Sequence, residues 1–159
     1  MSTLRYKPNT TVACVIHSQG KFLFVEELID NQLRLNQPAG HIEAHETLEQ
    51  ACRREVREET GLDVTLTGLI SIYQYSASEE LAFVRFTFAA EWQDNDQCIP
   101  LDNDIIACHW LTLDEIKQRK AVLRSPLVIK SIDDFLHKAH SPLSLINSDL
   151  QVIADNNNA

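Results

Sequence analysis

Three glutamates in the stretch 40–62 have a spacing suited to binding a metal ion: Glu55, Glu58 and Glu59. Residues three and four positions apart are neighbours on one face of a helix, so these carboxylates would repel one another. Two such charges about 4 Å apart repel by about 4 kcal/mol at an effective dielectric near 20. A divalent cation would offset this, because Mg²⁺ and Mn²⁺ prefer hard oxygen ligands. The spacing therefore indicates a metal site, with a solvated face of glutamate–arginine ion pairs as the alternative.

The stretch that carries these glutamates has helix signals at both ends. Thr47 with Gln50 three residues later is a capping-box pattern, which predicts that the helix begins at Leu48. Gly61 tolerates the left-handed conformation that often follows a helix, so we expect the helix to end near Thr60. Apolar residues recur at helical spacing and form one stripe to bury, comprising Leu48, Ala51, Cys52 and Val56.

The whole stretch fits a longer pattern, G-x5-E-x7-R-E-U-x-E-E-x-G-U, where U is aliphatic. The fixed positions are Gly40, Glu46, Arg54, Glu55, Val56, Glu58, Glu59, Gly61 and Leu62. This pattern resembles the Nudix box, and a match at every fixed position is far more specific than a short glycine motif. The resemblance implies an α/β/α sandwich with a mixed sheet and a loop-helix-loop box.

The resemblance also implies roles for the acids. Glu58 and Glu59 would bind the metal directly, and Glu55 would bind metal too or hold the attacking water. The backbone carbonyl of Ala39 would be a further ligand. The implied cofactor is Mg²⁺, with Mn²⁺ as an alternative. Bound divalent metals suit phosphate ester hydrolysis because they neutralise charge and activate water.

Four other box positions are expected to be structural. Glu46 would pair with Arg54 and hold the loop on the helix, without touching substrate. Gly40 permits a tight turn into the helix, and Gly61 ends it.

Nudix enzymes often use a further acid from a loop distant in sequence. The acidic segment 93–104 supplies Asp104, six residues before Trp110, as the first candidate. Glu80 and Asp102 are alternatives, and each of the three could equally be a solvated loop acid.

Two arginines are candidate phosphate contacts, because a guanidinium suits bidentate recognition of oxygen. They are Arg34 and Arg85; the alternatives are a surface strand residue for Arg34 and a pair with a core-edge acid for Arg85. His41 and His45 are four apart, but no third nitrogen or thiolate stands at ligand spacing, which argues against a zinc site. His45 could instead touch a phosphate.

Length and composition narrow the class of protein. A chain of 159 residues suits one domain, 1–159, with a core over about 7–140 and a tail over about 141–159. A formal net charge of -9 argues against nucleic-acid binding.

There is no apolar run near 18 residues, so no membrane span is expected. No signal-peptide core is present and the four cysteines are scattered, which favours a cytoplasmic protein. Either a monomer or a homodimer fits.

Apolar and β-branched runs predict the remaining elements. Strands are expected over 10–17, 21–26, 32–35, 63–75, 81–92 and 105–111, and helices over 48–60, 114–118 and 126–137. Residues 27–31 are expected to be a loop, 36–40 to interrupt the third strand, and Gly68 to bend the fourth. Two β-rich blocks separated by one helix, with another helix near the end, indicate an α+β fold.

Segments that lead into the box or lie beyond it resemble a group of small bacterial phosphatases of the Nudix family, over roughly 7–140. They are TVACVIHSQGKFLFVEE, NQPAGHIEAHETL, FVRFTFAAE, CHW and LRSPLVIKSI. The resemblance implies Mg²⁺-dependent removal of phosphate by water from nucleoside tri- and diphosphates. It also implies action on hydroxymethylpyrimidine diphosphate, a thiamine precursor. The chain has Leu-Arg-Leu before Asn36, where a tryptophan is expected in that group, so substrate preference is open.

Other functions fit the same fold. The first alternative is a pyrophosphohydrolase of other nucleoside diphosphate derivatives, such as ADP-ribose or damaged nucleotides. A non-catalytic ligand-binding module is less favoured, because all the box acids are present. RNA 5′-end processing is disfavoured by the acidic charge.

Overall fold

The computed structural model describes residues 5–94 and 98–152. Its strands are β1 (Asn9–Ser18), β2 (Lys21–Ile29), β3 (Gln32–Asn36), β4 (Ala39–His41), β5 (Leu66–Ser76), β6 (Ala82–Glu91) and β7 (Ile105–Thr112). Its α-helices are α1 (Leu48–Thr60), α2 (Leu113–Gln118) and α3 (Pro126–His137). Residues 1–4 and 153–159 of the expected domain, and 95–97 of the acidic segment, lie outside the described residues.

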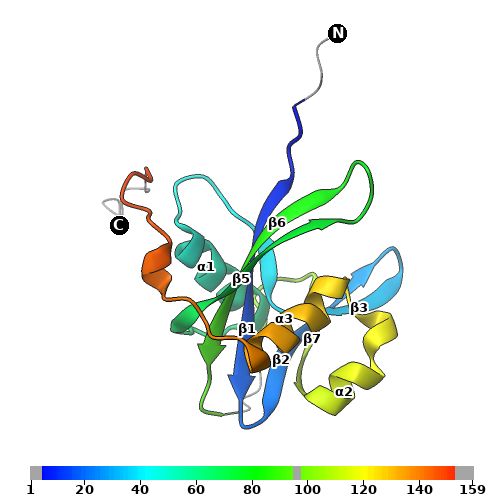
Figure 1. Ribbon diagram of the computed structural model, residues 1–159. Coiled ribbons are helices and arrows are strands. Elements are labelled where there is room, and N and C mark those ends of the chain that lie inside the picture. The colour runs from blue at the N-terminus through cyan, green and yellow to red at the C-terminus, as the bar shows by residue number, and fades with distance from the viewer. Residues whose placement is uncertain (1–4, 95–97, 153–159) are drawn as a thin grey trace.

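The strands form one mixed sheet (Figure 1). Its order is β3-β2-β1-β6-β5, with β4 paired to β1 and β7 paired to β2. β1 and β6 run parallel, whereas β1 pairs with β2 and β4 in the antiparallel sense. This arrangement confirms the expected α+β fold with a mixed sheet. In the described part of the chain, no helix is long and apolar enough to cross a membrane.

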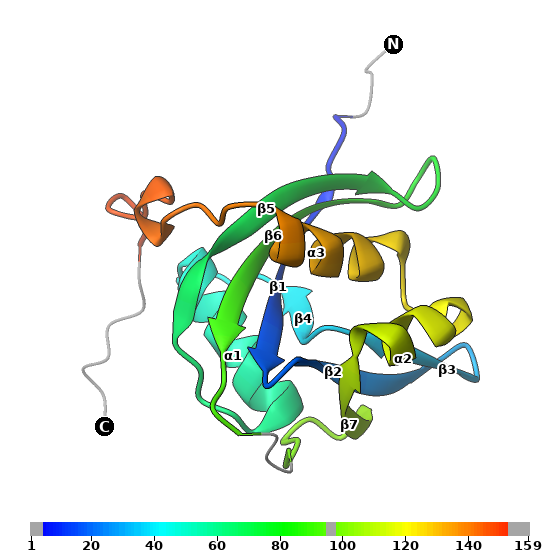
Figure 2. The same cartoon turned by 60° about the horizontal axis from the view of Figure 1, so that its bottom comes forward.

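Helices α1 and α3 cover opposite faces of the sheet, as Figure 2 shows with α3 in front of β1 and α1 behind it. On the α1 side, buried Ala51, Cys52 and Val56 pack with strand residues such as Phe88. On the α3 side, Val128 and Ile132 pack with other residues of β1, β2 and β6. Successive residues of a strand point to opposite faces, so the apolar runs of β1 and β2 supply both cores.

The ends of α1 follow the sequence prediction. Thr47 and Gln50 form the capping box, and Gly61 adopts the left-handed conformation with φ 75°. The short helix capped by Thr112 and the helix opened by Ser125-Pro126 are also present. These signals are local, so the sequence alone reveals them.

The expected loop over 27–31 is wrong. β2 continues to Ile29 and pairs with β3 across a turn at Asp30 and Asn31, whose φ angles are 48° and 60°. A two-residue hairpin turn of type I′ has positive φ at both central positions, and Asp and Asn tolerate it. The polar residues Asp30 and Asn31 were therefore read as part of a loop, although they form the turn of a continuous hairpin.

Two other boundaries differ from expectation. β4 was not expected, yet Ala39 to His41 pair with β1, and the Cys14 N–H donates to the Pro38 carbonyl at 3.0 Å. β5 begins at Leu66 and not near Asp63, with an irregular register between Leu66 and Gly68, which confirms a bend there. Both differences come from pairing with distant strands, which local patterns do not report.

The segment after α3 forms a strap along β5. Ser141 and Leu69 exchange two backbone hydrogen bonds, of 2.8 and 2.9 Å. A side chain at Gly68 would meet His140 and Ser141 at 3.0 and 3.1 Å. Leu143 and Ile146 then pack against the core on the α1 side. The first residues of the expected tail are therefore docked on the sheet.

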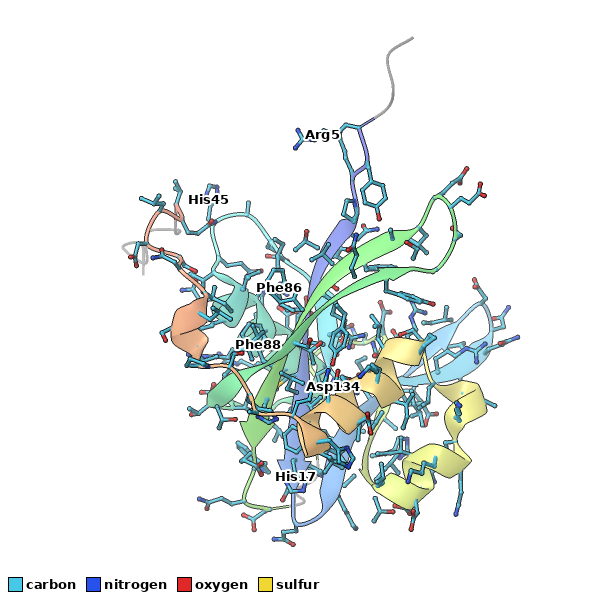
Figure 3. The ribbon with its side chains drawn as sticks, in the orientation of Figure 1. Arg5, His17, His45, Phe86, Phe88 and Asp134 are labelled. Carbon is cyan, nitrogen blue, oxygen red and sulfur yellow. The ribbon has the colours of Figure 1, made fainter. Side chains whose placement is uncertain are left out.

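Asp134 ties α3 to β5. Its side chain is 1% exposed and lies on the sheet side of α3 (Figure 3). It accepts hydrogen bonds from Tyr73 Oη at 2.7 Å, Lys130 Nζ at 2.5 Å and Lys138 Nζ at 2.8 Å. Burial alone would raise the pKa of Asp134, but these donors lower it to about 2.

We expect Asp134→Asn to lower the free energy of unfolding at pH 7 by about 2 kcal/mol, because charged hydrogen bonds in a buried site are lost. The folded-state pKa lies below the ordinary value of 3.8. The stabilisation is therefore present above that value and is lost as the pH falls toward 2. Urea unfolding at several pH values should show the gap between wild type and variant closing over that window. Equal stability at pH 7 would contradict this role.

Candidate active site

Helix α1 places two glutamates against the short strand β4. Glu59 is 8% exposed, and its Oε2 accepts a hydrogen bond from the Ala39 N–H at 3.0 Å. The Glu55 carboxylate fills the space where a side chain at Gly40 would stand, since a Cβ there would lie 2.2 to 2.4 Å from its atoms. A side chain at position 40 would therefore displace the Glu55 carboxylate.

Burial of these carboxylates is electrostatically unfavourable. Burial raises the pKa of Glu59 to about 8, against the opposing hydrogen bond from Ala39, and Glu55, Glu27 and Asp102 raise it further. Burial also raises the pKa of Glu55, which Arg54 partly offsets. A buried carboxylate without a cation disfavours its own ionised form. The pair is thus suited to a bound cation with a preference for oxygen.

Arg54 is the cation that organises the exposed side of the helix. It donates through Nε and an Nη to Glu46 at 3.0 and 2.8 Å, and to the His41 carbonyl at 3.0 Å. Its other Nη donates to Glu55 at 2.8 Å and to Glu58 at 3.2 Å. The expected Glu46–Arg54 pair is therefore present and ties the loop before α1 to the helix. Hydrogen bonding to Arg54 lowers the pKa of Glu46.

The donor set fits a hard divalent cation. The helix offers carboxylate oxygens from Glu55, Glu58 and Glu59, the type of ligand that Mg²⁺ takes. Within residues 5–94 and 98–152, no three Asp, Glu, His or Cys side chains are yet close enough together to form a metal site. Arg54 engages two of the three glutamates here, so they would have to turn toward the cation.

The histidines of the loop are not arranged as zinc ligands. His45 has φ 67°, and its Nδ1 lies 3.3 Å from the Val152 carbonyl. Figure 3 shows it at the outer end of the loop, beside the C-terminal segment. His41 contributes its carbonyl to Arg54 and its side chain is exposed.

The segment 101–104 lies against the end of α1. The N–H groups of Leu101 and Asp102 donate to the Glu58 carbonyl at 2.8 and 2.9 Å. Asp104 is exposed, and its N–H donates to Asp102 Oδ1 at 2.9 Å. The structure thus brings Asp102 and Asp104 to the helix that carries the glutamates. Glu80 stands in the exposed turn between β5 and β6, where its N–H bonds to Ser78.

Sequence reasoning missed Glu27. It lies on β2 at a register shift opposite β7, and burial raises its pKa, with Arg124 opposing and Asp102 and Asp104 adding to the rise. Its charge also acts on Glu59. It was missed because residues 27–31 were expected to be a loop. The available signal was the pair Glu26 and Glu27, which directly follows the apolar residues of β2.

The two candidate phosphate contacts occupy different environments. Arg34 is half-buried on β3, opposite Glu27, and donates to the Ala121 carbonyl at 3.1 Å and to Gln32. Arg85 is 6% exposed and donates to Gln37 Oε1 at 3.2 Å. The structure therefore places Arg34 near the acids and Arg85 inside the fold.

Helix α1, which carries the three glutamates, packs on the glycine-containing strand β4, in a mixed sheet that lies between helices α1 and α3. The NUDIX domain model matches residues 6–131. The chain therefore belongs to the Nudix hydrolase family, whose members generally use divalent metal ions.

Individual relatives agree with this assignment. Phosphatase NudJ from Escherichia coli K12 is 45% identical over 141 residues, which is 89% of this chain and 92% of that protein. A NUDIX hydrolase structure from Nitrosomonas europaea has a TM-score of 0.81 at 41% identity, covering 89% of this chain and 97% of that chain. The dihydroneopterin triphosphate pyrophosphohydrolase of E. coli has a TM-score of 0.66 at 21% identity, over 82% of this chain and 96% of that chain, and shows the fold alone.

We expect Gly40→Ala to abolish most of the hydrolase activity while the protein remains folded. The added methyl group would displace the Glu55 carboxylate, the mobile end of a flexible side chain, so the fold can adjust. A displaced catalytic group can lower turnover by about 100-fold. Steady-state kinetics with thermal unfolding in parallel would check this. Wild-type turnover in the variant would contradict the packing of Glu55 on Gly40.

Proposed function

We propose that this protein is a Mg²⁺-dependent phosphatase acting on small phosphorylated substrates. The substrates are nucleoside tri- and diphosphates and hydroxymethylpyrimidine diphosphate, and water attacks at phosphorus to release orthophosphate. The observation that carries the proposal is the 45% identity to Phosphatase NudJ over 89% of the chain. The chain also has every acid of the box pattern. The buried, cation-poor carboxylates of α1 support it, because they suit a metal-dependent hydrolase.

Glu55, Glu58, Glu59 and the Ala39 carbonyl would hold the metal. A divalent ion in this position supplies charge neutralisation and a more acidic bound water. The Ala39 N–H fixes one oxygen of Glu59, which leaves the other for the metal. Glu55 packs on Gly40, next to Ala39, so it would bind the metal too or hold the attacking water.

Asp104 is proposed as the distal acid, and Arg34 as a contact for substrate phosphate. Asp104 follows the turn held on the Glu58 carbonyl, so it can approach the metal-binding end of α1. Arg34 lies opposite Glu27 in the β2–β3 hairpin, and its guanidinium suits a phosphate. Glu27 and Asp102 are the competing acids, since both act on Glu59.

We expect Mg²⁺-dependent release of orthophosphate from GTP, GDP and hydroxymethylpyrimidine diphosphate, with products resolved chromatographically. Glu58→Gln should lower turnover by more than about 100-fold, because even outer-shell partners of a metal are worth 10–100-fold. Glu49→Gln, on the first turn of the same helix, is the matched control and should retain activity. Cleavage of ADP-ribose to AMP, with no orthophosphate from the other substrates, would favour the pyrophosphohydrolase alternative. A folded protein that binds nucleotide without turnover would favour the binding module.

We expect Asp104→Asn to lower kcat strongly without loss of stability, because it would remove a charged group from the reaction and not from the core. Asp114→Asn, an exposed acid in the first turn of α2, is the control. Single-turnover rates for Asp104→Asn, Asp102→Asn and Glu27→Gln would compare the three acids. An unchanged rate in Asp104→Asn, with a loss in one of the others, would transfer the role to that residue.

A further inference from the structure

Arg85 is a buried cation without an ionic partner. Its side chain on β6 is 6% exposed, and none of the described acids lies within ion-pair distance of it. Its hydrogen bonds go to neutral amides, at 3.2 Å to Gln37 Oε1 and 3.5 Å to Asn36 Oδ1. Within the described residues its Nε has no acceptor. Burying a charge in this way is unfavourable, so a role beyond packing is indicated.

Gln37 connects this cation to α3. It is fully buried, and its Nε2 donates to the Val128 carbonyl at 2.8 Å and to Ser131 Oγ at 2.9 Å. A side-chain amide has two donor hydrogens on nitrogen and an acceptor oxygen. With both donors used on α3, Oε1 must face Arg85. The position of Gln37 is thus specified from two sides, by α3 and by β6.

The residues that follow Gln37 form the floor of the active site. The Pro38 carbonyl accepts from Cys14 at 3.0 Å, and the Ala39 N–H donates to Glu59 Oε2 at 3.0 Å. Gly40 is the surface on which the Glu55 carboxylate packs. Only the Pro38 residue separates Gln37 from Ala39, and its ring restricts φ. A displacement at Gln37 therefore reaches both carboxylates through a short, stiff segment.

We propose that Arg85 and Gln37 are positioning residues of the hydrolase, which fix the 38–40 backbone so that Ala39 and Gly40 set the orientation of Glu59 and Glu55. This inference rests on the proposed function of those glutamates. It replaces substrate contact as the role of Arg85, because the guanidinium is enclosed by β6, α3 and the 36–37 segment. The interaction works through backbone placement, so it affects chemistry more than substrate binding.

The test compares Arg85→Met with Arg119→Met, an exposed arginine at the end of α2. For Arg85→Met we expect kcat to fall about 10-fold or more with KM changed less than about 2-fold, since misplaced catalytic groups lower turnover. Arg119→Met should match wild type. A rise in KM with unchanged kcat would overturn the proposal and return Arg85 to substrate binding.

A second readout uses the metal-free full-length protein and needs no activity. The Ala39 amide is held by Glu59, so its hydrogen exchange, measured by NMR, should be at least about 10-fold faster in Arg85→Met. The amide of Phe88, inside β6, should be unchanged. Unchanged exchange at Ala39 would overturn the proposal. If wild type released no phosphate from any substrate, the proposed function would fail while this exchange result still decided the role of Arg85.

The variant Arg85→Met/Gln37→Met guards against misfolding of the single variant. In Arg85→Met alone, the buried Gln37 Oε1 loses its hydrogen-bond donor. Replacing both residues by apolar side chains removes that unpaired oxygen. We expect the loss of kcat in the double variant to be smaller than the sum of the losses in Arg85→Met and Gln37→Met, because each single variant already breaks the connection between the two residues. Additive losses from Gln37→Met and Arg85→Met would show two independent effects and overturn the coupling.

Discussion

The structure depends on the burial of Glu59 at the contact between α1 and β4. A carboxylate that is 8% exposed, with neighbouring acids at Glu55, Glu27 and Asp102, is held by one backbone N–H from Ala39. Burial and like charges both oppose ionisation. The fold therefore holds, next to a short strand, a carboxylate whose ionised form is disfavoured without a cation. A bound cation would favour the ionised form of Glu59. The formal net charge of the chain, -9, also favours binding of a cation.

Arg54 connects the loop before α1 to the glutamates of the helix. Arg54 bonds to Glu46, Glu55, Glu58 and the His41 carbonyl, so a single guanidinium serves three acids and the backbone. The planar fork of arginine can make these bonds at once, which a lysine could not. Because the pair with Glu46 has its own two hydrogen bonds, Arg54 can remain on the loop while Glu55 and Glu58 turn to a metal.

The sequence predicts the parts of this site that are local. Thr47, Gln50 and Gly61 set the ends of α1, and the box spacing identifies its acids. It does not predict β4, whose three residues pair with β1, or the hydrogen bond between Arg85 and Gln37, which are 48 residues apart. Arg85 was a candidate phosphate contact, with an ion pair to a core-edge acid as the alternative, and the structure places it in the interior. Such contacts arise only when distant strands assemble, and they leave no periodic signal in the chain.

The strap after α3, residues 139–146, bears on the self-association of this protein. β5 is an edge of the sheet, and an open edge is a template for another strand. Ser141 occupies the backbone groups of Leu69, and His140 covers Gly68, so the chain shields the middle of its own edge. Beyond the strap, Ile72 is 51% exposed. Removal of residues 139–146 would extend the free edge next to an apolar side chain, and the protein would lose its built-in protection against self-association.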